Sequence, residues 1–373
     1  MQLPKFNKGI SSIPANQTIT SVSRQSFHAE LKKRINAHFD GARIKSTGNW
    51  VLYSKALILL TLYTGVYIHL VFYTPATWLA ITECILMGCL TAAIGFNIMH
   101  DGIHGSFSSR SWVNYLAGLS LNMLGANNFM WKTKHNIIHH TYTNIEGVDD
   151  DLEAKPLLRL CDTQTYYKIH RFQHWYFWAA YSLLYIWWVF YSDYNKYFRR
   201  KVGEVPLKPM AWYDHISFWG FKLVHAAIFI VIPIYQLGFT GWLVGFLTFG
   251  LFTGFVLSIV FQLAHTVEET HFPKADEVTH QMEDEWAIHQ LKTTANFATN
   301  NKVISWLLGG LNFQIEHHLF PRISHVHYPA ISRIIKDACK DFNIPYLEHP
   351  KMRMAVASHV SHLKHLSRRS PIK

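Results

Sequence analysis

The sequence predicts an all-α integral membrane protein with four spans arranged as two helical hairpins. Of its 373 residues, 49% are hydrophobic and only 16% are charged, which argues against a soluble enzyme and against a disordered chain. Crossing a hydrocarbon core takes about 20 residues at a rise of ~1.5 Å each. Four apolar segments have this length, at about residues 50–73, 77–99, 215–237 and 242–264.

Short turns join these segments into hairpins. Residues 74–76 separate the first two segments, and residues 238–241 separate the last two. Neither turn contains Lys or Arg, whereas both ends of the chain and the middle region 100–214 are basic. The positive-inside rule therefore places these regions, including both termini, in the cytosol. We expect three parts: an N-terminal arm at 1–49, a membrane domain at 50–350 and a basic tail at 351–373.

A fifth apolar run, residues 175–191, has only 17 residues and is rich in Trp and Tyr. If it crossed the membrane, Gln314 would lie on the face opposite His100 and His104. We therefore expect an interfacial helix on the cytosolic leaflet, where Trp and Tyr are favoured. A fifth span is the alternative interpretation.

Histidine accounts for 24 of the 373 residues, and many of these histidines gather in clusters. Residues three or four positions apart lie on one face of a helix, so the members of a cluster can point at one metal ion. His265 ends the fourth predicted span on the same cytosolic face. The clusters are His100 and His104, then His135, His139 and His140, and finally Gln314, His317 and His318.

The number of histidines predicts two metal ions. The seven clustered histidines and His265 make eight imidazoles, too many for one ion of four to six coordination sites. Imidazole ligands suit iron, zinc, copper or nickel, so the element stays open at this point. No H-E-x-x-H, P-loop or G-x-G-x-x-G motif occurs, which argues against a zinc protease, a nucleotide hydrolase and a dinucleotide-binding fold.

The three clusters, in this order and at these distances from two apolar hairpins, resemble the histidine boxes of the membrane fatty acid desaturases. The resemblance covers about residues 50–350. The second box continues through Asn144 to Asp149 and Asp151, which is similar to the acyl-CoA and acyl-lipid branch. Gln314, in place of a first histidine, resembles the third box of the front-end desaturases, which insert a double bond between an existing one and the carboxyl end.

The resemblance implies four spans under a cytosolic helical cap, two iron ions, and oxygen-dependent desaturation of a long-chain acyl-CoA or acyl-lipid. The carbonyl of Gln314 could coordinate weakly or hold a water. No His-Pro-Gly-Gly occurs and 49 N-terminal residues are too few for a fused cytochrome b5 domain, so we expect a separate ferredoxin, or cytochrome b5 with its reductase, as electron donor. The implied iron ligands are His100, His104, His135, His139, His140, His265, His317 and His318.

Polar residues near the boxes are candidates for supporting roles. Each imidazole must be oriented through its second nitrogen, for which we expect Asp101, Asn144, Asp149 and Glu316, with Asp150, Asp151, Glu268 and Glu269 also nearby. Headgroup or CoA phosphates would be bound by Arg110, Lys168, Arg171, Arg199 and Arg200. The acyl tunnel would be lined by Phe96, Phe129, Trp131, Trp306 and Phe313. Glu83 and Lys222 lie inside spans, where ionisable groups usually have a partner.

Other functions stay open at this point. A hydroxylase on the same scaffold would share the histidine boxes. A non-catalytic metal carrier would carry ionisable residues through the depth of its spans, and a membrane haem protein would place axial histidines there. The excess of 35 Lys and Arg over 24 Asp and Glu suits membrane lipids, phosphorylated substrates or acidic proteins. We expect no nucleic-acid partner.

Overall fold

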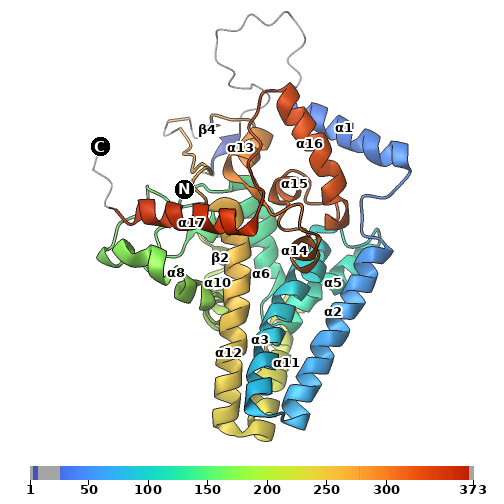
Figure 1. Cartoon of the computed structure of the whole chain (residues 1–373), viewed down its shortest axis with the longest axis vertical. Helices are drawn as coiled ribbons and strands as arrows, with labels where there is room; N and C mark the ends of the chain where they lie inside the picture. Colours follow the sequence, from blue (N-terminus) through green and yellow to red (C-terminus); the bar gives the residue numbers. More distant parts are fainter. Residues whose placement is uncertain (1–2, 7–25, 277, 280, 369–373) are drawn as a thin grey trace, which may run out of the picture.

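The computed structural model describes residues 3–6, 26–276, 278–279 and 281–368, so part of the predicted N-terminal arm and the end of the basic tail lie outside the described residues. Long helices run side by side in the lower half of the molecule, and shorter helices form a cap above them (Figure 1). The long helices are α2 (Trp50–Ile68), α3 (Thr77–Ile94), α11 (Trp212–Ala226) and α12 (Ile232–His265).

Three helices among the described residues are long and apolar enough to cross a membrane. They combine these α-helices with short π-helical turns and cover Trp50–Tyr73, Thr77–His104 and Trp212–His265. The third has 54 residues and includes both of the last two predicted spans.

The 54-residue helix Trp212–His265 is interrupted at Gly238, within α12. Its φ of 71° and ψ of 165° are not helical, and glycine adopts a positive φ without a steric penalty. Residues on the two sides of this glycine lie together, since the Trp242 indole N–H donates to the Phe229 carbonyl at 2.9 Å and the Phe229 and Phe249 rings stack at 5.8 Å. The two halves of the helix therefore pack against each other.

The first two long helices form a hairpin. The Asn49 side chain caps α2 by accepting a hydrogen bond from the Val51 amide at 2.9 Å. Thr74, with a φ of 44°, and Pro75 form the turn before α3. This turn lies where the sequence predicts it.

The predicted interfacial segment is a set of short helices and is not among the three helices long and apolar enough to span. Its Trp175 side chain is 76% exposed. The segment packs on α12 at Gly254, where a Cβ atom would lie 2.3 Å from the Ser182 carbonyl oxygen. Its helices are α8 (Gln173–Ser182), α9 (Leu184–Trp187) and a π turn at Trp188–Ser192, and α10 (Asp193–Arg199) follows it.

We expect Gly254→Ala to destabilise the protein by about 3 kcal/mol, the upper end of overpacking costs, because the clash is with backbone. Thermal unfolding of the purified chain in detergent measures this. Gly220→Ala is the matched control, since a Cβ atom there meets nothing within 4 Å and alanine favours the helix. Equal unfolding temperatures for wild type and Gly254→Ala would contradict the close contact of α8 with α12.

The cap is held together by an apolar core. Phe27, Leu31 and Ile35 of α1 pack in one buried cluster with Ile331 and Ile335 of α16. The predicted N-terminal arm thus contributes a helix to the cap. The remaining helices are α1 (Phe27–Ala42), α4 (His100–His104), α5 (Ser111–Met123), α6 (Asn128–Lys132), α7 (His140–Tyr142), α13 (Trp286–Thr293), α14 (Lys302–Leu307), α15 (Gln314–Leu319), α16 (Tyr328–Asp341) and α17 (Met352–Leu366).

Strands are few and short in the part of the chain described. They pair as two-residue ladders that fasten loops of the cap. The parallel pairs are β1 (Lys5–Phe6) with β4 (Gln281–Met282) and β5 (Asn296–Phe297) with β6 (Glu348–His349), and the antiparallel pair is β2 (Lys201–Val202) with β3 (Val205–Pro206).

Candidate metal centre

The three histidine clusters meet where the long helices reach the cap. The first cluster is on α4, which continues the second long helix, and the third is on α15. The second lies on the π-helical turn Thr133–His139 and the start of α7. His265 is the last residue of α12. All eight histidines are buried, none more than 7% exposed.

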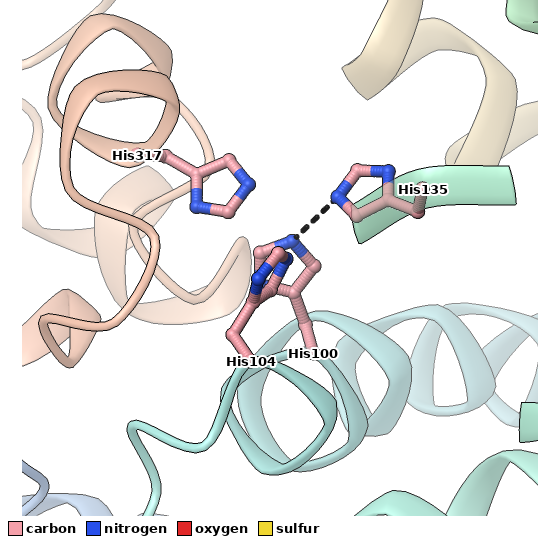
Figure 2. Close-up of side chains that lie close together, drawn as sticks. All are labelled: His100, His104, His135 and His317. Atoms are coloured by element: carbon pink, nitrogen blue, oxygen red, sulfur yellow. Dashed lines mark hydrogen bonds between the residues drawn. The ribbon is translucent and has the colours of Figure 1, made fainter. Parts of the chain in front are cut away.

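Four of these histidines form a first group. One nitrogen atom from each of them lies within 4.8 Å of the others. Their rings come from three separate elements and point toward a common centre (Figure 2). The members of the first group are His100, His104, His135 and His317.

His139, His265 and His318 form a second group by the same distance criterion. His140 lies between the two groups, because its ring centre is 4.5 Å from those of both His317 and His318. Its Nε2 atom is also 3.2 Å from Nε2 of His135. The eight predicted ligands therefore form one continuous centre with two all-histidine sub-sites, and His135, His139 and Asp151 form a further group that connects them.

Several nitrogens at this centre have no hydrogen-bond partner among the described residues. They are the buried Nε2 atoms of His104, His265, His317 and His318. A buried polar atom left unpaired costs about 1–3 kcal/mol, and native proteins rarely leave one without a reason. Bound metal ions would give these lone pairs a partner, so the donor set fits a metal centre.

In three of these rings the other nitrogen, Nδ1, lies within hydrogen-bond distance of a protein group. Nδ1 of His317 lies 3.1 Å from the Tyr328 hydroxyl. Nδ1 of His318 lies 2.8 Å from Oε1 of Gln290. Nδ1 of His265 is 3.1 Å from the Thr293 carbonyl oxygen. The oxygens beside His318 and His265 are acceptors, so they favour the Nδ1–H tautomer and leave Nε2 available to a metal, whereas the Tyr328 hydroxyl can donate or accept.

Burial and mutual repulsion keep most of these rings neutral. The largest effect is burial, which lowers the pKa of each ring, and the charges of neighbouring histidines lower it further. Together they hold four pKa values well below the usual range, those of His135, His140, His317 and His318. A neutral imidazole is the form that binds a metal. The pocket therefore disfavours a second proton on each of these rings at neutral pH.

His139 is the exception because carboxylates face it. Its Nδ1 atom lies 3.1 and 3.2 Å from the two carboxylate oxygens of Asp149 and 3.2 Å from Asp151. Burial opposes a charge on the ring, but these carboxylates outweigh burial and raise the pKa of His139. A carboxylate on the far nitrogen makes an imidazole a stronger metal ligand.

Comparison with known proteins decides the family. Residues 76–350 match the sequence profile described as fatty acid desaturase. The chain belongs to this family. It is therefore an oxidoreductase of fatty acyl chains, and the predicted reaction class is confirmed. Family members are membrane-bound, in agreement with the three long apolar helices.

Full-length relatives support the same assignment. The chain is 37% identical over 347 residues to the sn-1 linoleoyl-lipid 6-desaturase of Arthrospira platensis, covering 91% of this chain and 92% of that protein. It is 32% identical over 360 residues to the enzyme of the same name from Synechocystis sp., covering 95% and 99%. It is 33% identical over 344 residues to the acyl-lipid (8-3)-desaturase of Physcomitrium patens, covering 91% and 71%.

Two of the predicted orienting residues lie at the desaturase centre. Asp149 contacts His139 as described, and its carboxylate also accepts from the Asn144 amide at 2.9 Å. The Asn144 side chain in turn donates to the carbonyls of His265, at 2.8 Å, and His271, at 3.1 Å. Asn144 thereby connects the second box to the end of α12.

The other two predicted orienting residues contact different partners. Asp101 accepts from the Ser324 hydroxyl at 2.7 Å and lies 3.1 Å from Nδ1 of His325. Glu316 accepts from the Tyr346 hydroxyl at 2.6 Å and from the Asn296 amide at 2.8 Å. Both carboxylates fasten a box helix to the cap.

The other carboxylates near the boxes also have partners. Asp150 pairs with Lys134 and Lys196. Glu268 accepts from Ser361, and Glu269 accepts from Ser358.

Gln314 precedes His317 and His318 by about one turn on α15. It is only 1% exposed, and its Nε2 atom has no hydrogen-bond partner among the described residues. The amide is therefore available to a group that the chain itself does not supply. A weak metal contact or a held water, as the sequence suggests, stays a prediction.

The predicted headgroup residues do not gather around the histidines. All five side chains are exposed, and within the described residues no hydrogen bond or ion pair joins them to the clusters. Their roles stay predictions. They lie on separate surface elements: Arg110 before α5, Lys168 and Arg171 in the 3₁₀ turn Lys168–Phe172, and Arg199 and Arg200 at the end of α10.

Lys55 is a buried group that sequence reasoning missed. It lies in the first candidate span and is 4% exposed. Its ammonium donates to Oδ1 of Asn97 at 2.6 Å and to the Trp306 carbonyl at 3.1 Å, and it lies 3.0 Å from Nε2 of His325. An ionisable residue inside an apolar segment is the signal that could have found it.

The same signal did single out Glu83 and Lys222, and both have partners. The Glu83 carboxylate lies 2.7 Å from Nδ1 of His69. The Lys222 ammonium pairs with Asp193 at 3.1 Å and donates to the carbonyls of Gly125 and Val189. The first pair joins the first two long helices, and the second joins α11 to α10.

Proposed function

We propose that this chain is an oxygen-dependent acyl-lipid desaturase with two iron ions at the histidine centre. The overall reaction converts –CH₂–CH₂– with O₂, two electrons and two protons into –CH=CH– and two waters. The observation that carries the proposal is the pair of buried histidine groups whose Nε2 atoms lack partners. Iron in such a site supplies the oxygen activation that an unactivated methylene requires.

We assign the first histidine group to one iron and the second group to the other. His140, which lies between the groups, can serve either ion. The protein's contribution is to hold the rings: Asp149, Gln290, Tyr328 and the Thr293 carbonyl fix their second nitrogens. Gln314 adds an amide oxygen or a water where a histidine is missing.

The proposed topology has four spans, with both termini, the cap and the iron centre on the cytosolic side. It is supported by the fold-back at Gly238 and by the position of the histidines at one end of the long helices. The proposed electron donor is a cytosolic ferredoxin, or cytochrome b5 with its reductase. A basic chain attracts such acidic partners.

The proposed substrate is a lipid-linked acyl chain that already contains a double bond. Both cyanobacterial relatives are named linoleoyl-lipid 6-desaturases, and the moss relative is named an acyl-lipid (8-3)-desaturase. Gln314 in the third box favours the same kind of substrate, since it resembles the third box of the front-end desaturases. The new double bond would lie between the existing one and the carboxyl end.

Product analysis tests this proposal. The full chain is expressed in aerobic cells with a ferredoxin and its reductase, and linoleate is supplied. Gas chromatography with mass spectrometry should find a new acid with a double bond on the carboxyl side of the existing one, absent from cells without the chain. A hydroxylated acid, or a new bond on the methyl side, would contradict the proposal.

A further inference from the structure

A basic hollow of about 590 Å³ opens on the cap between α14 and the start of α17. Lys302, Lys351 and Arg353 line it, all three are exposed, and none of them forms an ion pair within the described residues. The carboxylate of Glu348, close by on β6, pairs with Lys336 at 2.5 Å. The hollow therefore presents uncompensated positive charge.

The hollow lies at the level where the apolar helices end. The Trp306 carbonyl of α14 accepts from Lys55 in the first long helix, at 3.1 Å. The Leu307 carbonyl accepts from Asn97 in the second, at 2.9 Å. α14 thus lies between the ends of α2 and α3 and the cap (Figure 1).

The outer face of α14 is apolar. Val303 is 67% exposed, Trp306 37% and Leu307 44%. Exposed apolar side chains that include a tryptophan, next to basic residues, are typical of a surface at the depth of lipid headgroups. This neighbourhood favours a membrane lipid over a soluble acidic protein as the occupant of the hollow.

Apolar side chains continue from the hollow toward the histidines. Ile304 and Met352 line the hollow and pack on the same core cluster as Phe96 and Phe261. The rings of Phe96 and Phe261 are 6.0 Å apart, and Phe261 is 6.2 Å from the His135 ring. A continuous series of apolar contacts therefore connects the hollow with the first histidine group.

We propose that the hollow binds the phosphate of an anionic membrane lipid, held by Lys302, Lys351 and Arg353. The acyl chain of that lipid extends past Phe96 and Phe261 toward His135, and this second statement rests on the proposed desaturase function. The binding site is thus distinct from the five basic residues that the sequence suggested. Phosphate recognition follows from the three cations, and lipid recognition follows from the apolar face of α14.

A lipid titration tests the site without requiring activity. The purified full chain in neutral detergent is titrated with phosphatidylglycerol, and bound lipid is counted by native mass spectrometry. The triple variant Lys302→Gln, Lys351→Gln and Arg353→Gln should weaken binding about tenfold or more, since each cation adds to the attraction of an anionic lipid. Phosphatidylcholine with the same acyl chains should bind weakly to both proteins.

A second triple variant controls for net charge. Lys32→Gln, Lys33→Gln and Lys340→Gln remove three exposed lysines from α1 and α16, at the far end of the cap (Figure 1). This variant should keep its affinity for phosphatidylglycerol. Equal affinities of wild type and hollow variant would overturn the proposal. Displacement of the lipid by equimolar coenzyme A would also overturn it, by indicating a CoA site.

Kinetic measurements then distinguish a failure of the lipid-site proposal from a failure of the proposed desaturase function. With acyl phosphatidylglycerol as substrate, the hollow variant should raise KM while kcat stays within about twofold, because the cations bind the headgroup and not the reacting carbons. A variant that keeps its lipid affinity but loses its response to ferredoxin would assign the hollow to the electron donor instead. If wild type forms no double bond, the proposed function fails, while the titration still decides the hollow.

Discussion

Replacing His317 with alanine is expected to abolish double-bond formation. His317 is one of four histidines that converge in the first group, its Nε2 atom has no hydrogen-bond partner among the described residues, and its Nδ1 lies beside the Tyr328 hydroxyl. Losing a hydrogen-bond partner of a ligand costs about 10–100-fold in metal affinity or activity, so losing the ligand itself should cost at least ~100-fold. Product analysis and the iron content of the purified variant measure the two effects.

His359→Ala is the control for the loss of a buried imidazole. His359 is 0% exposed, and both ring nitrogens are bonded within the protein, to Tyr181 at 2.9 Å and Thr266 at 2.7 Å. This variant should lose stability but keep its iron. Normal product formation by His317→Ala, or equal loss of iron from both variants, would contradict the assignment.

Replacing Asp149 with alanine should have the second-largest effect. Its carboxylate orients His139 and also accepts from the amides of Asn144, at 2.9 Å, and Asp151, at 3.1 Å. Without it, the second group should bind iron about 10–100-fold more weakly. Asp149→Asn retains one acceptor oxygen and should lie between alanine and wild type.

Iron titration of the apo-protein, followed by activity at saturating iron, measures this effect. Glu268→Gln is the matched control, because Glu268 is exposed and its carboxylate, which lies near the boxes, accepts from the Ser361 hydroxyl and not from a box histidine. Its iron affinity should match that of wild type. An Asp149→Ala variant with unchanged iron affinity would show that the carboxylate has no part in holding the metal.

Helical spacing predicted the box histidines because periodicity is a local property. His100 and His104 share one face of α4 whatever the rest of the chain does. Their division into two sub-sites could not be predicted, because it depends on how helices distant in sequence converge. His139 and His140 are adjacent in sequence, yet one belongs to the second group and the other lies between the groups.

Which residues orient the histidines also depends on the tertiary structure and could not all be predicted from local spacing. Asp101 and Glu316 each stand next to a box histidine, but adjacent residues on a helix point about 100° apart, so these carboxylates face the cap instead. Gln290 and Tyr328 hold His318 and His317 from separate segments that contain no histidine box. Only the tertiary structure brings such pairs together.

Hydropathy predicted the apolar segments well, since length and composition alone decide whether a helix can cross a membrane. The local pattern did not predict that the segment after residue 173 divides into short helices. Their packing on α12 depends on the close approach at Gly254. Lys55 was missed because one lysine changes the mean hydropathy of a long apolar segment very little.

Iron stoichiometry tests the two-metal centre most directly. The full chain is purified after expression with iron, and metal per chain is measured by inductively coupled plasma mass spectrometry alongside desaturation. Two irons per chain in the active protein are expected, with Mössbauer signals from two nitrogen-rich environments. Full activity with a single iron per chain, or with zinc alone, would contradict a centre in which the two histidine groups each hold an iron ion.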